Sequence, residues 1–490
     1  MLFNSYAFIL GFLPAVLAGF LLLGRIDRRI GAAWLALASL FFYGWWDPRY
    51  VPLLLGSAVV NFLAGASLAR QASRRLLALG ISANLLLLGF FKYADFFVGT
   101  VNLATGTAWP LPGIVLPIGI SFYTFTQIAY LADAYRGEAR DYDFVHYLLF
   151  VSYFPHLIAG PLLHHAQVMP QFDDPGTYRV RLPNVNLGLV LFGVGLFKKT
   201  VLADQLATIA SPMFDAAAHG GTPTAAAAWV GGIAYALQIY FDFSGYSDMA
   251  LGLSRMFNVE LPVNFFSPYK ARDMVEFWRR WHMTLSAFLR DYLYIPLGGN
   301  RRGTGRRYAN LMVTMLLGGL WHGASWTFVA WGGLHGLYLV ANHAWRALRR
   351  RLGIPALPAV AGIAVTFACV VVAWVPFRAA DFATTLRILH GMAGAGGSGL
   401  ASSVPALWPF VIRADVAPEL SHGAWLALAL AVAFVAPNIY QLTGRRLEPC
   451  ADDRPPRAAA WLAFACGVLF FLGLKALAAG EPSPFLYFQF

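Results

Sequence analysis

Long apolar runs, separated by short and mostly basic segments, dominate the chain. A stretch of about 20 predominantly apolar residues is long enough to cross a bilayer as a helix. The pattern predicts membrane helices near 5–24, 30–46, 51–69, 76–93, 111–132, 186–207, 225–245, 357–377, 422–440 and 457–477. The predicted fold class is therefore all-α. We expect a polytopic integral membrane protein with about 10–12 transmembrane helices, organised as one membrane-embedded domain over 1–490.

Clusters of arginine set the expected orientation, because cytoplasmic loops carry an excess of Lys and Arg. Placing the clusters after the first and third runs in the cytoplasm puts both chain termini on the outer side. The apolar stretch 145–163 then has both ends in the cytoplasm, and Pro155 and Gly160 interrupt it, so we expect a re-entrant segment. By the same reasoning 309–345 begins and ends in the cytoplasm, with its midpoint at 321–327 deep in the protein.

Composition mainly excludes nucleic acid as a partner. Hydrophobic residues make up 58% of the chain and charged residues only 12%, about half the charged share of a soluble domain. The formal net charge of +12 would suggest nucleic acid in a soluble protein. In a membrane protein, basic loops set the topology and contact anionic lipid, so we expect membrane lipid, and no nucleic acid, as a partner.

The strongest candidate for chemistry is the run WHGASW at 321–326, in the middle of a long apolar stretch. An ionisable residue at such depth is costly, and function is its default explanation. Burial disfavours the charged imidazole, so His322 can stay neutral and accept a proton. The alternative is a structural histidine hydrogen-bonded to a neighbouring helix. The other residues that we expect to line a tunnel or the substrate here are Trp321, Gly323, Ser325 and Trp326.

A second candidate lies in 257–308, which is too polar to cross the membrane and which we predict to be a cytoplasmic amphipathic segment. On a helix, Trp278, Trp281 and His282 share one face, because they stand at i, i+3 and i+4. A simple interfacial anchor explains the two tryptophans well. It explains His282 less well, since His282 would point inward beside them. We therefore predict that Trp278 and Trp281 also line the tunnel or the substrate.

Polar residues near a membrane boundary form a third group, consisting of Gln238, Asp242 and Asp248. Carboxylates at this depth need partners, and Arg255 or the basic loop could supply them. We favour a structural hydrogen-bond network here over direct catalysis.

No metal site is predicted. The three cysteines are scattered and lack metal-ligand spacing. His156 with the pair His164 and His165 is weak evidence for a metal, because no carboxylate or cysteine at ligand spacing joins them.

Two runs carry a family resemblance. FWRRWHMTLSAFLRDYLYIPLGGN at 277–300 and WHGASWTFVAWGGLHG at 321–336 are similar to the two signatures of the membrane-bound O-acyltransferases. Further similar runs lie at 1–14, 41–50, 116–137, 153–163, 238–253 and in the last residues, SPFLYFQF. The similar runs cover nearly the whole chain, with the signature region at 238–345. Together they resemble the bacterial polysaccharide O-acetyltransferase branch of the family.

The resemblance implies helices in a ring around a central tunnel, in the bacterial inner membrane with both termini periplasmic. It implies that His322 and His282 are catalytic, with His322 as a general base or a brief carrier of the acyl group. It also implies acetyl-CoA, or another cytoplasmic acyl donor, as a substrate and no bound cofactor. The expected partner is a periplasmic serine-hydrolase-like acetyltransferase, and the expected acceptor, reached directly or indirectly, is a polysaccharide such as alginate.

Two alternatives remain at this point. One is D-alanyl or other acyl transfer to a cell-envelope polymer, since the D-alanine transfer proteins of teichoic acid share the two histidine motifs. The other, from a different class, is a transporter or flippase, in which re-entrant segments and intramembrane polar residues also occur. A transporter has no reason to carry the two histidine signatures.

Overall fold

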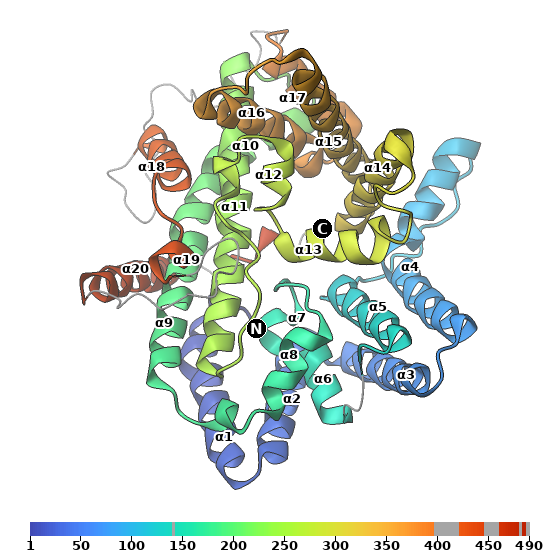
Figure 1. The fold of residues 1–490 in the computed structure, drawn as a ribbon. Helices are drawn as coiled ribbons and strands as arrows, with labels where there is room; N and C mark the ends of the chain where they lie inside the picture. The colour runs from blue at the N-terminus through green and yellow to red at the C-terminus, as the bar shows by residue number, and fades with distance from the viewer. Residues whose placement is uncertain (140–142, 396–420, 445–459, 480–482, 487–490) are drawn as a thin grey trace. The chain divides into compact units, whose positions relative to one another are not determined.

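In the computed structural model, all regular secondary structure of the described residues is helical (Figure 1). The structure describes residues 1–139, 143–395, 421–444, 460–479 and 483–486. The chain, which the sequence pattern treats as one membrane-embedded domain, forms two compact units. The first unit comprises Met1–Gly193 with Tyr246–Val263, and the second comprises Val194–Gly245 with Asn264–Phe490.

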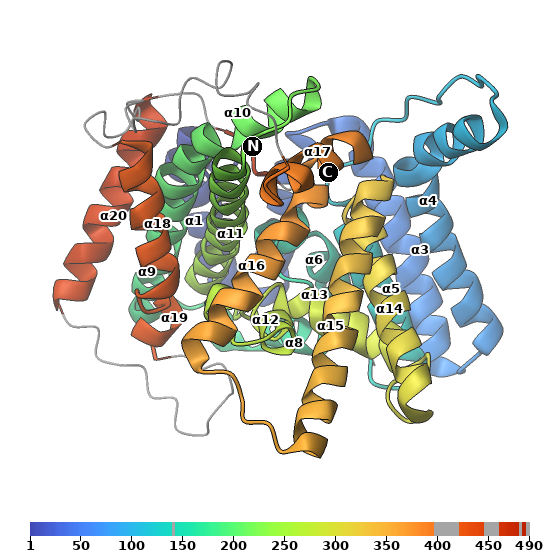
Figure 2. The ribbon, with the colours of Figure 1, turned by 90° about the horizontal axis from the view of Figure 1, so that it is seen from above.

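The first unit consists mainly of apolar helices, several of which begin at a side-chain cap. Its helices are η1 (Ala7–Phe12), α1 (Leu13–Ile26), α2 (Arg28–Gly44), η2 (Pro48–Tyr50), α3 (Val51–Arg70), α4 (Arg74–Thr105), α5 (Ile120–Arg136), α6 (Phe144–Ser152), α7 (Phe154–Leu157), α8 (His165–Asp173) and η3 (Pro175–Tyr178). Asp27 accepts a hydrogen bond from the backbone N–H of Arg29 at 2.6 Å and so caps α2. Helices α1 and α2 pack against each other. Helices α3 and α4 both pack against α5 (Figure 2).

The second unit contains the remaining helices and both histidine signatures. Its helices are η4 (Lys198–Ala203), α10 (Asp204–Ala218), η5 (Pro268–Lys270), α12 (Met274–Trp278), α13 (Met283–Leu289), η6 (Arg290–Tyr294), α14 (Gly303–His322), α15 (Trp326–Leu352), α16 (Ala359–Arg378), α17 (Phe382–Met392), α18 (His422–Phe434), α19 (Ile439–Leu442) and α20 (Ala460–Ala479). Two further helices, α9 (Leu182–Phe197) and α11 (Ala225–Met256), belong partly to each unit.

The apolar runs of the sequence coincide with helices, and each of the predicted runs overlaps at least one. Among the described residues, five helical segments are long and apolar enough to cross a membrane: Ala7–Ile26, Pro48–Arg70, Arg74–Thr105, Leu182–Ala218 and Ala359–Arg378. Shorter apolar helices lie at His422–Phe434 and Phe464–Ala478. The predicted all-α, polytopic membrane fold is confirmed.

The stretch 309–345 folds as a helical hairpin, in which α14 and α15 lie side by side (Figure 1). A Cβ atom on Gly319 would stand 2.2 Å from the carbonyl oxygen of Phe328, and one on Gly332 would stand 2.2 Å from that of Met315. Glycine at these positions therefore lets the two backbones approach closely. The turn between the helices falls within the predicted midpoint at 321–327, so both ends of the hairpin emerge on one side.

Candidate active site

His322 is the last residue of α14 and is only 4% exposed. Its ring lies among aromatic rings, with centroid distances of 5.0 Å to Trp321, 5.0 Å to Trp331 and 5.3 Å to Phe377. The C-terminal end of a helix carries partial negative charge, which stabilises a nearby cation by about 0.3–1 kcal/mol at exposed sites and more when partly buried. The position therefore suits a histidine that takes up a proton for part of a reaction cycle.

His282 lies beside His322, although the two are far apart in the sequence. The centroids of the two imidazole rings are 6.3 Å apart. The His282 side chain is fully buried, and its ring packs edge-on against Phe243 at 4.9 Å. The two histidines that the sequence pattern singled out in separate segments thus belong to one buried cluster of the second unit.

Asn264 fixes the protonation pattern of His282, and the sequence pattern did not reveal it. The side-chain oxygen of Asn264 accepts hydrogen bonds from the backbone N–H of Thr284 at 3.3 Å and from its hydroxyl at 2.9 Å. Because a backbone N–H only donates, this Asn264 atom is the oxygen, and the Nδ1–H of His282 must donate to it at 3.1 Å. The neutral imidazole then carries its lone pair on Nε2, a buried atom with no hydrogen-bond partner among the described residues.

The predicted continuous helix through Trp278, Trp281 and His282 is wrong. Helix α12 ends at Trp278, α13 begins at Met283, and His282 itself adopts the left-handed conformation, with φ 42° and ψ 54°. Such a backbone costs a non-glycine residue about 1–2 kcal/mol. All three side chains nevertheless point inward, as predicted, because they are buried in the core of the second unit and do not form a surface anchor.

The predicted lining residues divide into two groups. Those buried with the two histidines in the second unit are Trp278, Trp281, Trp321 and Gly323. Ser325 instead caps α15 by accepting a hydrogen bond from the backbone N–H of Thr327 at 3.2 Å. Trp326 is 47% exposed and lies outside the buried cluster.

The predicted polar network exists at Asp242, but with a different partner. Lys199, on η4, places its Nζ 2.7 Å from Asp242 and 2.9 Å from Asp204. Arg255, the expected partner, pairs with Glu260 at 3.0 Å instead. A lysine inside an apolar run needs a buried counter-charge, and this requirement was the signal available in the sequence.

Two other residues of the predicted network, Gln238 and Asp248, are also buried on α11. Gln238 belongs to the second unit and Asp248 to the first.

The last described residues complete the ion-pair cluster. The Ser483 hydroxyl donates to Asp204 at 2.8 Å, and the backbone N–H of Leu486 donates to Asp242 at 3.0 Å. The Phe485 ring lies 5.2 Å from the Lys199 ammonium. The run SPFLYFQF therefore begins by docking onto buried charges, and its final residues, 487–490, lie outside the described part of the chain.

The histidines of the first unit make structural hydrogen bonds. The Nε2 of His156 bonds the backbone carbonyl of Phe150 at 2.8 Å. His165 bridges the Asp133 carboxylate at 3.0 Å and the backbone carbonyl of Glu138 at 3.1 Å. These contacts hold the broken segment around α6 to α8 in place.

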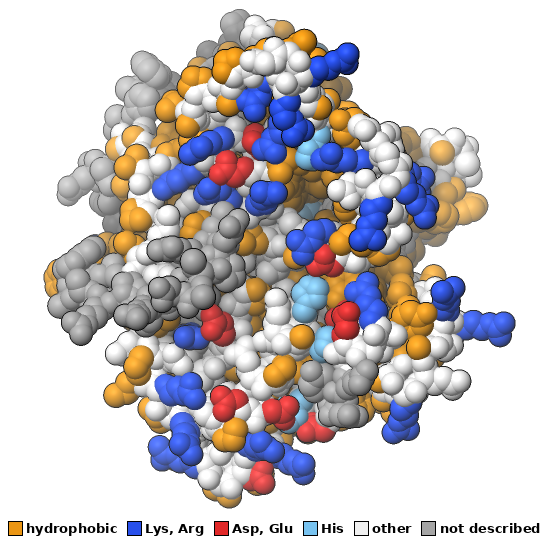
Figure 3. Space-filling model, viewed as in Figure 1, with side chains coloured by type: hydrophobic (Ala, Val, Ile, Leu, Met, Phe, Trp, Pro, Cys, Tyr) orange, Lys and Arg blue, Asp and Glu red, His pale blue; other side chains and the backbone are white. Residues whose placement is uncertain are grey.

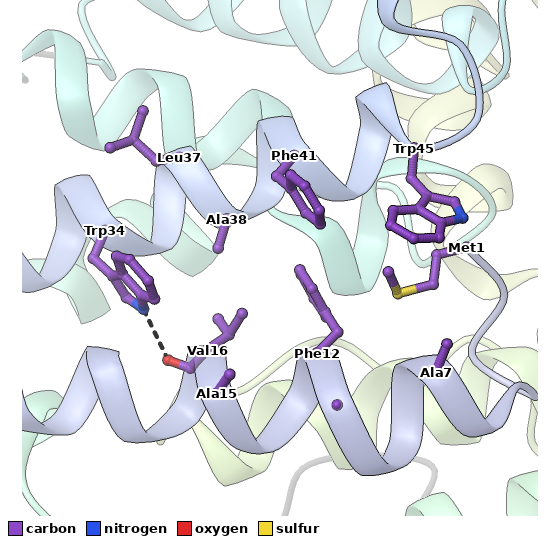
Figure 4. Close-up of a pocket in the computed structure, with 11 residues that line it drawn as sticks. Met1, Ala7, Phe12, Ala15, Val16, Trp34, Leu37, Ala38, Phe41 and Trp45 are labelled. Carbon is purple, nitrogen blue, oxygen red and sulfur yellow. Dashed lines mark hydrogen bonds between the residues drawn. The ribbon is translucent and has the colours of Figure 1, made fainter.

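An apolar groove of about 560 Å³ in the first unit lies between η1 with α1 and α2 (Figure 4). Trp34 donates a hydrogen bond from its indole N–H to the Val16 carbonyl at 3.0 Å across it. The side chains that line the groove include Phe12, Phe41 and Trp45, and none of the lining side chains titrates. These side chains offer apolar contact but no group for acid–base or nucleophilic chemistry.

Basic side chains gather over α12 and around the ends of α14 and α15, with histidine among them (Figure 3). Arg307 donates to Nδ1 of His343 at 2.8 Å, and Arg346 pairs with Asp273, the N-cap of α12. Burial and then the Arg307 and Arg346 guanidiniums lower the pKa of His343. We call Arg307, His343 and Arg346 the basic rim; it offers positive charge to an anionic group.

Comparison with known proteins identifies a matching family and several similar proteins. The model of the membrane-bound O-acyltransferase family matches residues 115–376. The chain is 43% identical to the peptidoglycan O-acetyltransferase of Helicobacter pylori, over 82% of this chain and 81% of the relative. It is 37% identical to "Probable alginate O-acetylase AlgI" of Pseudomonas putida over the full length of both. A teichoic acid D-alanyltransferase of Streptococcus thermophilus is 30% identical over 53% of this chain and 68% of the relative.

Proposed function

Because the chain belongs to the membrane-bound O-acyltransferase family, we propose that this enzyme passes an acetyl group from cytoplasmic acetyl-CoA toward a hydroxyl of an exported or cell-wall polysaccharide. Family membership favours an O-acyltransferase over the transporter or flippase alternative. The observation that carries the proposal is the pair of buried histidines, His282 and His322, with ring centroids 6.3 Å apart.

The names of the similar proteins support acetyl as the transferred group. The relatives from Helicobacter and Pseudomonas that match most of this chain are named for O-acetylation of peptidoglycan or alginate. The relatives named for D-alanyl transfer match only about half of it. We propose acetyl transfer on this basis, and D-alanyl transfer is the outcome that the test below must exclude.

The two histidines suit a base-catalysed transfer. A neutral His322 takes the proton of the acceptor hydroxyl while the oxygen attacks the thioester carbonyl, and the C-terminal end of α14 stabilises the resulting imidazolium. The C–S bond then breaks, and the departing thiolate takes the proton back. His282, whose Nδ1–H is held by Asn264, presents its Nε2 lone pair as a hydrogen-bond acceptor that orients the hydroxyl or the His322 ring.

The basic rim is suited to binding the acyl donor where it enters the site. Coenzyme A carries phosphate groups, which arginine recognises well. Arg307 and Arg346 lie near the open end of the α14–α15 hairpin, whereas His322 lies at its turn. We propose that the donor enters from this side, because the excess of Lys and Arg there favours a cytoplasmic location.

We place the enzyme in the bacterial inner membrane with both termini periplasmic. As the family resemblance implies, a periplasmic serine-hydrolase-like acetyltransferase would receive the group and complete its transfer to the polymer. Membrane lipid surrounds the apolar helices.

Both loops that flank 145–163 are expected on the cytoplasmic side. Helix α6 has nine residues, about 14 Å at 1.5 Å per residue, which is too short for a hydrocarbon core of about 30 Å. Single cysteines introduced after residues 140 and 175, in a variant without the natural cysteines, should be labelled from the same side. Labelling from opposite sides would show that the segment crosses the membrane.

Replacing His282 by Ala should lower acyl transfer by about 10²-fold, the lower end for loss of a group that assists proton transfer. The matched control is Ser267→Ala, because Ser267 is also left-handed, with φ 47°, in the same unit. Both variants keep a non-glycine residue in the left-handed conformation, but only His282→Ala should lose activity. Wild-type transfer by His282→Ala would make His282 a packing residue.

The proposed function is tested with purified protein, an acceptor polysaccharide and two labelled donors. Radiolabelled acetyl-CoA should label the polysaccharide once the periplasmic partner is added, whereas a D-alanyl carrier protein should not. Labelling from the D-alanyl donor alone would replace acetyl transfer by D-alanyl transfer.

A further inference from the structure

His335, on α15, is a fully buried histidine of the second unit that the proposed chemistry leaves unused. Its side chain is 0% exposed. Aromatic rings surround it, with centroid distances of 4.8 Å to Trp331, 5.1 Å to Trp278 and 6.0 Å to Phe277. Trp331 also contacts His322, at 5.0 Å. A single tryptophan thus separates this third histidine from the reaction centre.

A histidine surrounded by aromatic rings is unfavourable unless its ring nitrogens form hydrogen bonds with another group. Neither ring nitrogen of His335 has a hydrogen-bond partner among the described residues. A buried polar group without a partner costs about 1–3 kcal/mol, and an apolar group of the same shape would avoid that cost. Phenylalanine would fill this space with no such penalty, so packing alone does not account for the histidine.

The face of α15 that carries His335 leads from His322 to the basic rim. Trp331, His335, Tyr338, Asn342 and Arg346 recur at three- or four-residue intervals and so share one face. The side-chain oxygen of Asn342 is likewise buried without a hydrogen-bond partner among the described residues. His335 and Arg346 are eleven residues apart, which corresponds to about 16 Å along the helix axis.

We propose that His335 hydrogen-bonds an amide group in the pantetheine arm of the acyl donor and so positions the thioester at His322. This inference rests on the proposed function and assigns a donor-positioning residue within it. A neutral imidazole has one donor and one acceptor nitrogen, and an amide offers one N–H and one C=O in return. In this proposal the arm runs along α15, with the donor phosphates at the basic rim and the thioester beside His322.

The pantetheine arm has two sources, free coenzyme A and the prosthetic group of an acyl carrier protein. The same contact at His335 serves both. The two donors differ at the basic rim, where coenzyme A presents a nucleotide and the carrier protein presents a protein surface. The experiment therefore offers each as a separate probe.

The test compares His335→Phe, His335→Gln and wild type in purified, detergent-solubilised full-length protein. His335→Phe should fold at least as well as wild type. It should also raise the KM for acetyl-CoA about tenfold, the effect of one lost buried hydrogen bond. The KM for the acceptor should not change. Gln offers a donor and an acceptor, so His335→Gln should recover part of the loss. The matched control is His422→Phe, a buried histidine of the same unit on α18.

A second readout uses no catalysis, namely the affinity for coenzyme A or for a phosphopantetheinylated carrier protein. We expect His335→Phe to weaken it by a similar factor for whichever probe the wild type binds. Wild-type KM and affinity in His335→Phe, with an active wild type, would overturn the role of His335 and leave the proposed function standing. A wild type that binds neither probe and transfers no acetyl would refute both.

Discussion

Replacing His322 by Gln is expected to lower the acyl-transfer rate by about 10²–10⁴-fold, the range that general-base catalysis contributes. Gln has a similar length and keeps hydrogen-bonding groups, but it cannot take up a proton near neutral pH. A packing role at the end of α14 would tolerate Gln better than Ala. A proton-accepting role tolerates neither substitution.

The measurement is the acetyl content of the polysaccharide, together with the amount of protein in the membrane fraction. His422→Gln serves as the control, because His422 is also buried in the second unit and its ring makes a long contact of 3.4 Å with the Thr208 hydroxyl. That variant should keep wild-type acetylation. Added imidazole should partly restore transfer in His322→Ala, where truncation leaves space among Trp321, Trp331 and Phe377.

Replacing Lys199 by Met is expected to reduce the stability of the folded protein by about 3–5 kcal/mol, the cost of leaving a buried charge without its partner. Asp242 is buried, and its carboxylate would keep only the Leu486 N–H among the contacts described above. The docked segment that begins at Ser483 should also lose its anchor. Thermal unfolding in detergent, with the yield of membrane-inserted protein, measures the effect.

A double substitution separates the missing charge from the missing packing. Lys199→Met combined with Asp242→Asn removes both buried charges and should recover part of the lost stability. Lys475→Met is the matched control, since Lys475 lies exposed on α20. A Lys199→Met protein as stable as Lys475→Met would show that the ion pair contributes nothing to the fold.

The sequence predicts the helical architecture well, because crossing a bilayer requires long apolar helices whatever their tertiary neighbours are. The hairpin turn is the clearest example, since 321–327 was expected at depth and α15 begins at Trp326. The prediction of a continuous helix from periodicity was wrong at His282. A left-handed residue leaves no mark in the spacing of apolar positions, so the pattern continued where the backbone breaks.

The partners of the site were harder to predict, since they depend on contacts between distant parts of the chain. Asn264 is eighteen residues before His282 and has no feature that sets it apart from other loop asparagines. Lys199 did carry a signal, being a charge inside an apolar run, but its carboxylate partner lies on α11. His335 falls within the second signature run, yet only the structure shows that it is buried among aromatic rings.

Transfer of the acetyl group from the cytoplasmic side through His322 can be measured with inverted membrane vesicles, whose cytoplasmic face is outward. Radiolabelled acetyl-CoA is added outside, and label is counted in the acceptor polysaccharide trapped inside with the periplasmic partner. Wild-type vesicles should transfer label, whereas His322→Gln vesicles and right-side-out vesicles given the same donor should not. Equal transfer by wild type and His322→Gln would rule out His322 as the essential base, and transfer only when the donor meets the periplasmic face would rule out a cytoplasmic donor.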